Sequence, residues 1–147
     1  MNTYALDLEK YEALARRAAA EGCVLLENKN HALPLRDGDK VSVFGRSAFR
    51  YYKSGLGSGG LVNTRYVTGI LDGLEAYSQI QLDERLLEIY RDWIAENPYD
   101  EGQGWGKVPW SQKEMPVTEE MVQIARESDA ALVVIGRTAG EDQDNTA

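Results

Sequence analysis

The apolar run at residues 131–135 (ALVVI) is the feature that most limits what this chain can fold into. It is rich in β-branched residues, which favours a strand. Every position in the run is apolar, and a strand with two apolar faces is typical of a parallel sheet that helices cover on both sides. We therefore expect this strand in the covered interior of a parallel sheet, within an α/β fold.

Strands and helices are predicted to alternate along the rest of the chain. Residues 41–44 (VSVF) predict a buried strand that ends at Gly45, residues 79–82 predict another strand, and residues 24–28 predict a short strand or extended segment. Capping residues and apolar spacing predict four helices: Asp7 to Gly22, Thr68 through Tyr77, Asp83 through Ile94, and Thr118 to about Ser128. This order predicts a three-layer α/β sandwich with a mostly parallel sheet.

Two polar segments follow the two clearest strands. The first, residues 54–60, holds four glycines: Gly55, Gly57, Gly59 and Gly60. That density is costly in conformational entropy unless the backbone makes turns with positive φ or something approaches it closely. The second, residues 137–145 (RTAGEDQDN), follows the strand at 131–135. Ligands bind at the carboxyl ends of parallel strands, so we expect both segments at one crevice if the two strands are neighbours.

The charge of the chain argues against several classes of partner. There are 24 acidic and 16 basic residues, a formal net charge of −8. An acidic surface repels phosphate backbones, so no nucleic acid is expected. No apolar run approaches the roughly 20 residues of a membrane-spanning helix, so no membrane partner is expected. The first dozen residues are too charged for a signal peptide, and we expect a cytoplasmic protein.

Cysteine and histidine are too few for a zinc site, because the chain has one of each, Cys23 and His31. Cys23 precedes an apolar run and is expected to be a small buried residue, whereas His31 stands in a polar turn and is expected at the surface. A catalytic Ser/His/Asp set would need a nucleophile elbow, which the sequence lacks. We expect no metal and no cofactor.

Residues 97–116 show no hydrophobic period. They hold three of the four prolines and two of the three tryptophans. A structureless stretch of this length within a compact domain is uncommon and tends to be a functional loop or a disordered insertion. Two interpretations remain: a surface excursion that Trp105 and Trp110 pack down, or a loop that contacts a ligand.

Five motifs, taken together, resemble a known family. They are RAAAEGCVLLEN at 17–28, LPL at 33–35, VSVFG at 41–45, the glycine-rich segment at 53–63 and VVIGRTAGEDQDN at 133–145. In this order they resemble the second, α/β-sandwich domain of glycoside hydrolase family 3, which contains β-glucosidases and related exo-acting glycosidases.

The resemblance implies a division of labour between two domains. In that family a (β/α)8 barrel supplies the aspartate nucleophile, while the sandwich domain closes over the sugar pocket and commonly supplies the acid/base carboxylate. A retaining glycosidase needs both carboxyl groups, roughly 5 to 5.5 Å apart. We therefore expect a β-glucoside or oligosaccharide substrate, a barrel domain of the same enzyme as partner, and no hydrolysis by residues 1–147 alone.

The chain departs from the family pattern in two respects. The sandwich-like segment begins close to Met1, whereas most members place the barrel first, so a permuted order or a trimmed chain is expected. The family's sandwich is also longer than this one, so residues 1–147 are expected to form a partial domain. An incomplete sheet would leave an exposed edge beside the strand that contains Val133.

Glu141 is the residue that we predict to be the acid/base catalyst. It lies in a loop past a buried strand, and its environment would have to raise its pKa for it to donate a proton near neutral pH. The alternatives are a solvated acidic loop, or an acid/base residue beyond Ala147. In the latter case Glu141, Asp142 and Asp144 would bind sugar hydroxyls or shape the loop. Asp142, Asp144 and Thr146 have the spacing of a calcium loop, but Ala147 replaces its glycine, so no metal is predicted.

Five further residues are predicted to bind substrate. Arg46 and Arg137 each follow a glycine that ends a strand, and a guanidinium can bind sugar hydroxyls or pair with a loop carboxylate. A structural ion pair is the expected role of at least one of them. Ser58, Gly59 and Gly60 are predicted to bring the backbone close to the sugar; otherwise they form a tight turn that packs against the barrel.

Two other functions fit parts of the sequence. Gly55, Gly57 and Gly60 match a dinucleotide-binding fingerprint, and Asp83 follows at about the distance of the ribose-binding acid. Residues 46–54 separate these glycines from their strand, so a phosphate would not meet a helix N-terminus. The remaining alternative is a docking domain that has no ligand of its own.

Overall fold

The structure is a computed structural model that describes residues 5, 7–50, 63–104, 107–109 and 111–136. The chain divides into two compact units, Met1–Pro34 and Leu35–Ala147. That residues 1–147 form one partial sandwich domain stays a prediction.

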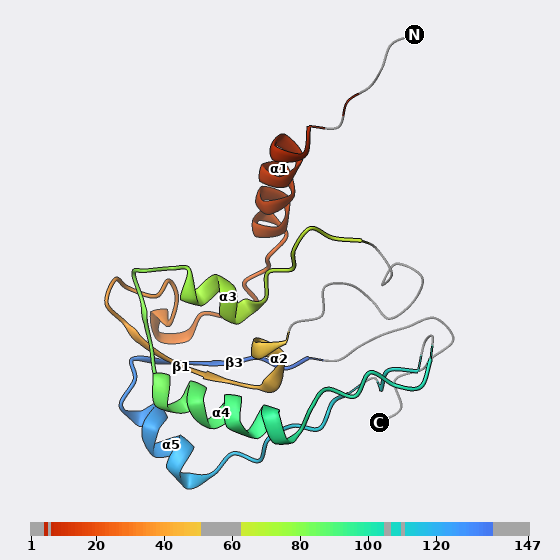
Figure 1. The fold of residues 1–147 in the computed structure, drawn as a ribbon. Coiled ribbons are helices and arrows are strands. Elements are labelled where there is room, and N and C mark those ends of the chain that lie inside the picture. The colour runs from red at the N-terminus through yellow and green to blue at the C-terminus, as the bar shows by residue number, and fades with distance from the viewer. Residues whose placement is uncertain (1–4, 6, 51–62, 105–106, 110, 137–147) are drawn as a thin grey trace. The chain divides into compact units, whose positions relative to one another are not determined.

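The first unit contains one long helix, α1 (Leu8–Glu21), followed by a short 3-10 helix at Lys29–His31 (Figure 1). The Asp7 carboxylate caps α1 by accepting a hydrogen bond from the Lys10 N–H, and Gly22 ends the helix, as predicted. Of the two states predicted for residues 24–28, the strand is wrong, because this stretch pairs with no strand within the part of the chain that the structure describes, and the extended segment stays a prediction.

Cys23 is exposed, which corrects the expectation that it is buried. Its Sγ lies 3.4 Å from the Ala19 carbonyl oxygen, one turn back along the chain, and donates a hydrogen bond to it. The apolar residues that follow are also exposed, since Val24 keeps 77% of its accessible surface and Leu26 keeps 92%. Packing therefore does not bury the thiol, although the sequence around it is apolar.

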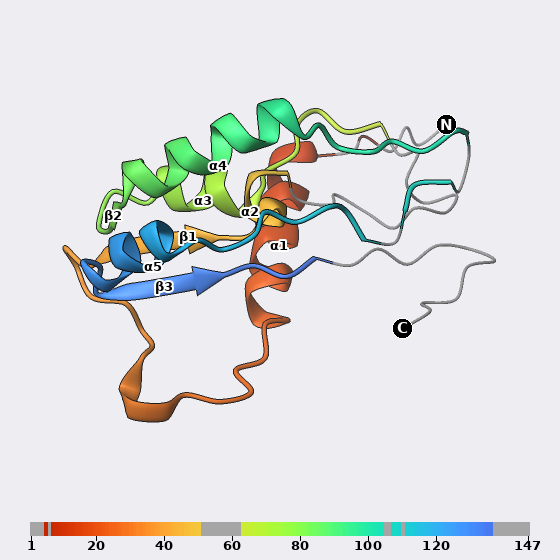
Figure 2. The ribbon, with the colours of Figure 1, turned by 90° about the horizontal axis from the view of Figure 1, so that it is seen from below.

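The second unit is built on a parallel sheet of three strands, β1 (Lys40–Phe44), β2 (Gln81–Leu82) and β3 (Ala130–Val133). The strand order is β2-β1-β3, and β1 is parallel to both neighbours. Figures 1 and 2 show β1 and β3 side by side. The register pairs Val41 with Ala130 and Phe44 with Val133, so the two strands end at the same edge of the sheet.

Helices cover both faces of this sheet (Figure 1). They are α2 (Arg46–Phe49), α3 (Ile70–Glu75), α4 (Glu84–Glu96) and α5 (Glu119–Arg126). Val41 and Val43 face one hydrophobic core with residues of α2 and α3 and with Leu87 of α4. Phe44 faces a second core with other residues of α4 and with α5. The alternation of side chains along β1 thus separates two cores, and the predicted α/β sandwich with a parallel sheet is confirmed.

Two of the predicted helices begin where their caps predicted. The Asp83 carboxylate caps α4 and Thr118 caps α5. The third is shifted, because Gly69 rather than Thr68 precedes α3. There the Asp72 carboxylate accepts a hydrogen bond from the Gly69 N–H at 2.6 Å, so an acid inside the first turn supplies the cap.

β3 is parallel as predicted, but it is not in the covered interior. Within the described residues it forms an edge of the sheet, and Val133 keeps 62% and Ile135 83% of their accessible surface. The fully apolar composition of residues 131–135 predicted that other elements cover both faces of the strand. The described residues cover little of it. β1 is the central strand, and the exposed edge expected beside Val133 is present in this part of the chain. None of the described helices is long and apolar enough to cross a membrane.

Candidate functional site at the carboxyl edge of the sheet

The carboxyl ends of β1 and β3 meet at Gly45. This residue has φ +98°, a left-handed conformation that favours glycine. A β-carbon at this position would lie 2.1 Å from the carbonyl oxygen of Val134, which is a severe clash. The Val134 N–H also donates to the Phe44 carbonyl oxygen at 2.9 Å. The chain therefore leaves both strands at nearly the same point.

This arrangement confirms that the strands before the two polar segments are parallel neighbours. The chain therefore leaves both strands at one edge of the sheet, as a ligand crevice would require. Most of the predicted site residues lie outside the described residues: Ser58, Gly59, Gly60, Arg137, Glu141, Asp142 and Asp144. Their roles stay predictions, and Arg46 is the one predicted site residue whose contacts the structure gives.

Tyr90, a residue of α4, holds the turn at Gly45 through a hydrogen bond. Its hydroxyl accepts a hydrogen bond from the Gly45 N–H at 3.0 Å, and its side chain is 1% exposed. The ring stacks on Phe49 with centroids 5.2 Å apart. Burial raises the pKa of the Tyr90 hydroxyl, and the hydrogen bond from Gly45 opposes that rise. No sequence signal indicated this contact, because the partner of the Tyr90 hydroxyl is a main-chain N–H.

Arg46 is 6% exposed, and its guanidinium is bound to main-chain oxygens. One terminal nitrogen donates to the Lys113 carbonyl at 2.6 Å, and the other donates to the Asn97 carbonyl at 2.9 Å. The guanidinium carbon also lies 5.3 Å from the centroid of the Trp93 ring, within range of a cation–π interaction. These are structural contacts, and binding of sugar by Arg46 stays a prediction.

Glu114 accepts from the main chain of Arg46. Its two carboxylate oxygens lie 3.2 and 3.1 Å from the Arg46 backbone nitrogen, and one of them also accepts from the Met115 N–H. Glu114 thus satisfies a donor at the start of α2 that the short helix leaves without an internal acceptor. No sequence signal indicated this residue.

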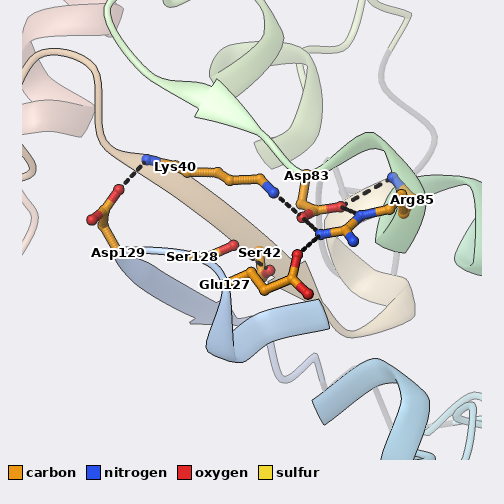
Figure 3. Close-up of polar contacts among 7 residues, drawn as sticks. All are labelled: Lys40, Ser42, Asp83, Arg85, Glu127, Ser128 and Asp129. Carbon is orange, nitrogen blue, oxygen red and sulfur yellow. Dashed lines mark hydrogen bonds and ion pairs between the residues drawn. The ribbon is translucent and has the colours of Figure 1, made fainter. Parts of the chain in front are cut away.

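A separate polar cluster lies near the amino ends of β1 and β3, beside Asp83, which follows the short strand β2 (Figure 3). We call it the amino-edge network; its members are Lys40, Ser42, Asp83, Arg85, Glu127, Ser128 and Asp129. Asp83 is 2% exposed and pairs with both Lys40 and Arg85, and Arg85 also pairs with Glu127. The hydrogen bonds from Arg85, together with the Lys40 ammonium, hold the pKa of Asp83 well below its usual range.

The rest of the amino-edge network joins β1 to the start of β3. The Lys40 N–H donates to the Asp129 carboxylate at 2.8 Å, and the Ser42 and Ser128 hydroxyls share a hydrogen bond of 2.9 Å. Because Asp83 is enclosed by two cations, its carboxylate is not available to a ribose, which argues against the dinucleotide alternative. Among the described residues, no group of three or more His, Cys, Asp or Glu side chains is placed to hold a metal ion.

A parallel sheet with helices on both faces makes this an α/β sandwich domain. Residues 23–147 match the model of the glycosyl hydrolase family 3 C-terminal domain. The chain therefore belongs to this family, and the predicted family is confirmed.

Similar proteins agree with this assignment. The chain is 51% identical over 142 residues to a β-glucosidase of Ruminococcus albus, and 33% identical over 138 residues to β-glucosidase A of Butyrivibrio fibrisolvens. These alignments span 96% and 92% of this chain but only 15% and 16% of the relatives. The chain thus corresponds to less than a fifth of each.

Solved structures give the same result. A crystal structure of a β-glucosidase from Paenibacillus barengoltzii is 53% identical, with a TM-score of 0.90, over 99% of this chain and 16% of that one. β-Glucosidase 3B of Thermotoga neapolitana in complex with α-D-glucose is 33% identical, with a TM-score of 0.81, over 95% of this chain and 19% of that one.

Proposed function

We propose that this domain forms one wall of the sugar-binding site of a β-glucosidase, together with a (β/α)8 barrel domain of the same enzyme. The observation that supports the proposal is the parallel pairing of β1 with β3, from which the chain leaves both strands at one edge of the sheet. The similarity to β-glucosidases supports β-glucosides as the substrate class. Ser58, Gly59 and Gly60 would lie against the sugar, with Arg137, Asp142 and Asp144 at its hydroxyls.

Glu141 is proposed as the general acid that protonates the leaving oxygen. The nucleophile would come from the barrel, so residues 1–147 alone should not hydrolyse aryl β-glucosides. Hydrolysis by this chain that Glu141→Gln abolishes would contradict the proposed division of labour. The cytoplasmic location also stays a proposal, which fractionation of cells that produce the whole enzyme would test.

The role of Glu141 is tested in the whole enzyme with two substrates. A good leaving group needs little protonation, so Glu141→Gln should lower kcat/KM for dinitrophenyl β-glucoside by less than about tenfold. For cellobiose the same variant should lose on the order of 10²- to 10⁴-fold, the usual contribution of a general acid. Asp142→Asn is the matched control, because a residue that only binds sugar should cost both substrates equally. Equal losses for Glu141→Gln would make Glu141 a binding residue.

A further inference from the structure

Loop 97–116 connects α4 to α5. Residues near both of its ends bind the Arg46 guanidinium. Its first residue, Asn97, and a residue near its other end, Lys113, each offer a main-chain carbonyl to the Arg46 guanidinium, at 2.9 and 2.6 Å. The planar fork of arginine suits two separate acceptors at once. Figures 1 and 2 show the loop running past the carboxyl ends of β1 and β3. Arg46 thus closes the neck of the loop beside the proposed sugar site.

The two limbs of the loop are also tied to each other. The Lys113 ammonium donates to the Asn97 side-chain oxygen at 2.6 Å. Further along, Gln112 accepts from the Asp100 N–H at 2.8 Å and donates to the Asp100 carbonyl at 3.1 Å. The described part of loop 97–116 is therefore a cross-linked excursion with a defined neck.

Arg50, at the other end of α2, holds the outgoing limb at a second place. Its guanidinium carbon lies 4.2 Å from the centroid of the Tyr99 ring, and its side chain pairs with Glu101. A single turn of helix directly after β1 therefore binds the loop through two arginines. Any movement of this turn relative to β1 would move the loop with it.

We propose that Arg46 is a positioning residue of the sugar site, which acts by holding loop 97–116 at the carboxyl end of β1 and not by binding sugar. This inference rests on the proposed function, because it takes the carboxyl edge to face the substrate. The guanidinium already has two carbonyl acceptors and an aromatic face, and its exposure of 6% leaves little surface for a sugar hydroxyl.

The test compares three variants of the whole enzyme: Arg46→Gln, Lys113→Met and Arg91→Gln. Trypsin cleavage after the exposed Lys107 reports how firmly loop 97–116 is held, and KM and kcat for cellobiose report the sugar site. Arg91→Gln is the matched control, because Arg91 pairs with Glu75 and Glu84 on the surface and does not touch the loop neck.

For Arg46→Gln we expect cleavage after Lys107 to accelerate about tenfold, since local opening governs proteolysis when reclosing is fast. We expect KM to rise about tenfold with kcat within about twofold, because only placement of the substrate is impaired. Arg46→Lys should give intermediate values, and Arg91→Gln should match the wild type. If Arg46→Gln does not fold, Lys113→Met decides, with smaller changes in the same direction.

Two outcomes would overturn the positioning role while hydrolysis is intact. A higher KM with unchanged cleavage after Lys107 would mean that Arg46 acts on the sugar directly. Faster cleavage with unchanged KM would mean that loop 97–116 is no part of the site. If the wild-type enzyme does not hydrolyse β-glucosides, the proposed function fails, and a positioning role in a sugar site fails with it.

Discussion

The two edges of the sheet use their charged residues differently. In the amino-edge network, Lys40, Asp83, Arg85 and Glu127 neutralise one another. At the carboxyl edge the buried Arg46 binds main-chain carbonyls instead. The first arrangement closes on itself and joins the strands, whereas the second attaches a long loop to the end of a strand. The charged residues of the two edges thus differ in what they bind: side chains at the amino edge and the main chain of a loop at the carboxyl edge.

The largest effect is expected at the carboxyl edge from Gly45→Ala. The new β-carbon would lie 2.1 Å from the Val134 carbonyl oxygen, in a backbone conformation that alanine rarely adopts. We expect a loss of about 4 kcal/mol in the free energy of unfolding, measured by urea denaturation of the chain. Gly38→Ala is the control, because Gly38 has a similar φ of +90° but nothing within 4 Å of an added β-carbon. It should cost about 1 kcal/mol, the lower end of the cost of backbone strain. Equal losses for the two variants would show that the strand ends are not in contact at Gly45.

The next effect is expected in the amino-edge network from Asp83→Asn. Removing the carboxylate leaves Lys40 and Arg85 without their buried partner, which should cost about 3 kcal/mol near pH 7. Because the pKa of Asp83 is lower in the folded chain than in the unfolded one, its contribution is complete above the ordinary value near 4. The difference between wild type and variant should therefore shrink as the pH falls below about 4. A difference that does not depend on pH would remove the ionic explanation.

The smallest effects compare one buried hydroxyl from each edge. Tyr90→Phe leaves the Gly45 N–H without its acceptor, and we expect a loss of about 2 kcal/mol. Ser42→Ala removes the partner of Ser128, which is only partly buried and can bind water, so a loss of about 1 kcal/mol is expected. Both are measured by urea denaturation. A larger loss for Ser42→Ala would reverse the view that the turn at Gly45 is the more tightly constrained place.

Local signals made much of the fold predictable. The caps at Asp7, Asp83 and Thr118 each set the start of a helix, because the side chain that satisfies the first free N–H groups lies within three residues of them. The strands at 41–44 and 131–135 were recognisable from short apolar runs rich in valine. Their pairing with each other was the condition on which the predicted crevice depended, and it is seen only in the structure. The predicted burial of the strand at 131–135 was wrong. An apolar composition shows that a strand suits cover on both faces, but it does not show whether the described part of the chain provides that cover.

The contacts of the site were largely beyond prediction. The acceptors of the Arg46 guanidinium lie 51 and 67 residues along the chain, and they are main-chain carbonyls, which every residue possesses. A hydrogen bond to a main-chain carbonyl does not require any particular residue type at the acceptor position, so the sequence does not reveal it. The same holds for Glu114, whose partner is a backbone N–H. Sequence reasoning found Arg46 from its place after a strand-ending glycine, but it assigned the guanidinium to sugar or to a carboxylate.

The contact between the strand ends at Gly45 marks a boundary between the packed scaffold and the segments that follow the two strands. The paired strands and the two hydrophobic cores define a scaffold. One segment follows Arg50, after β1 and α2, and another follows Gly136, after β3. Surface segments tolerate changes in length and composition, so both could be replaced without moving the strand ends. Grafting of foreign loops at these two junctions should therefore redirect specificity while the frame that presents them is inherited unchanged.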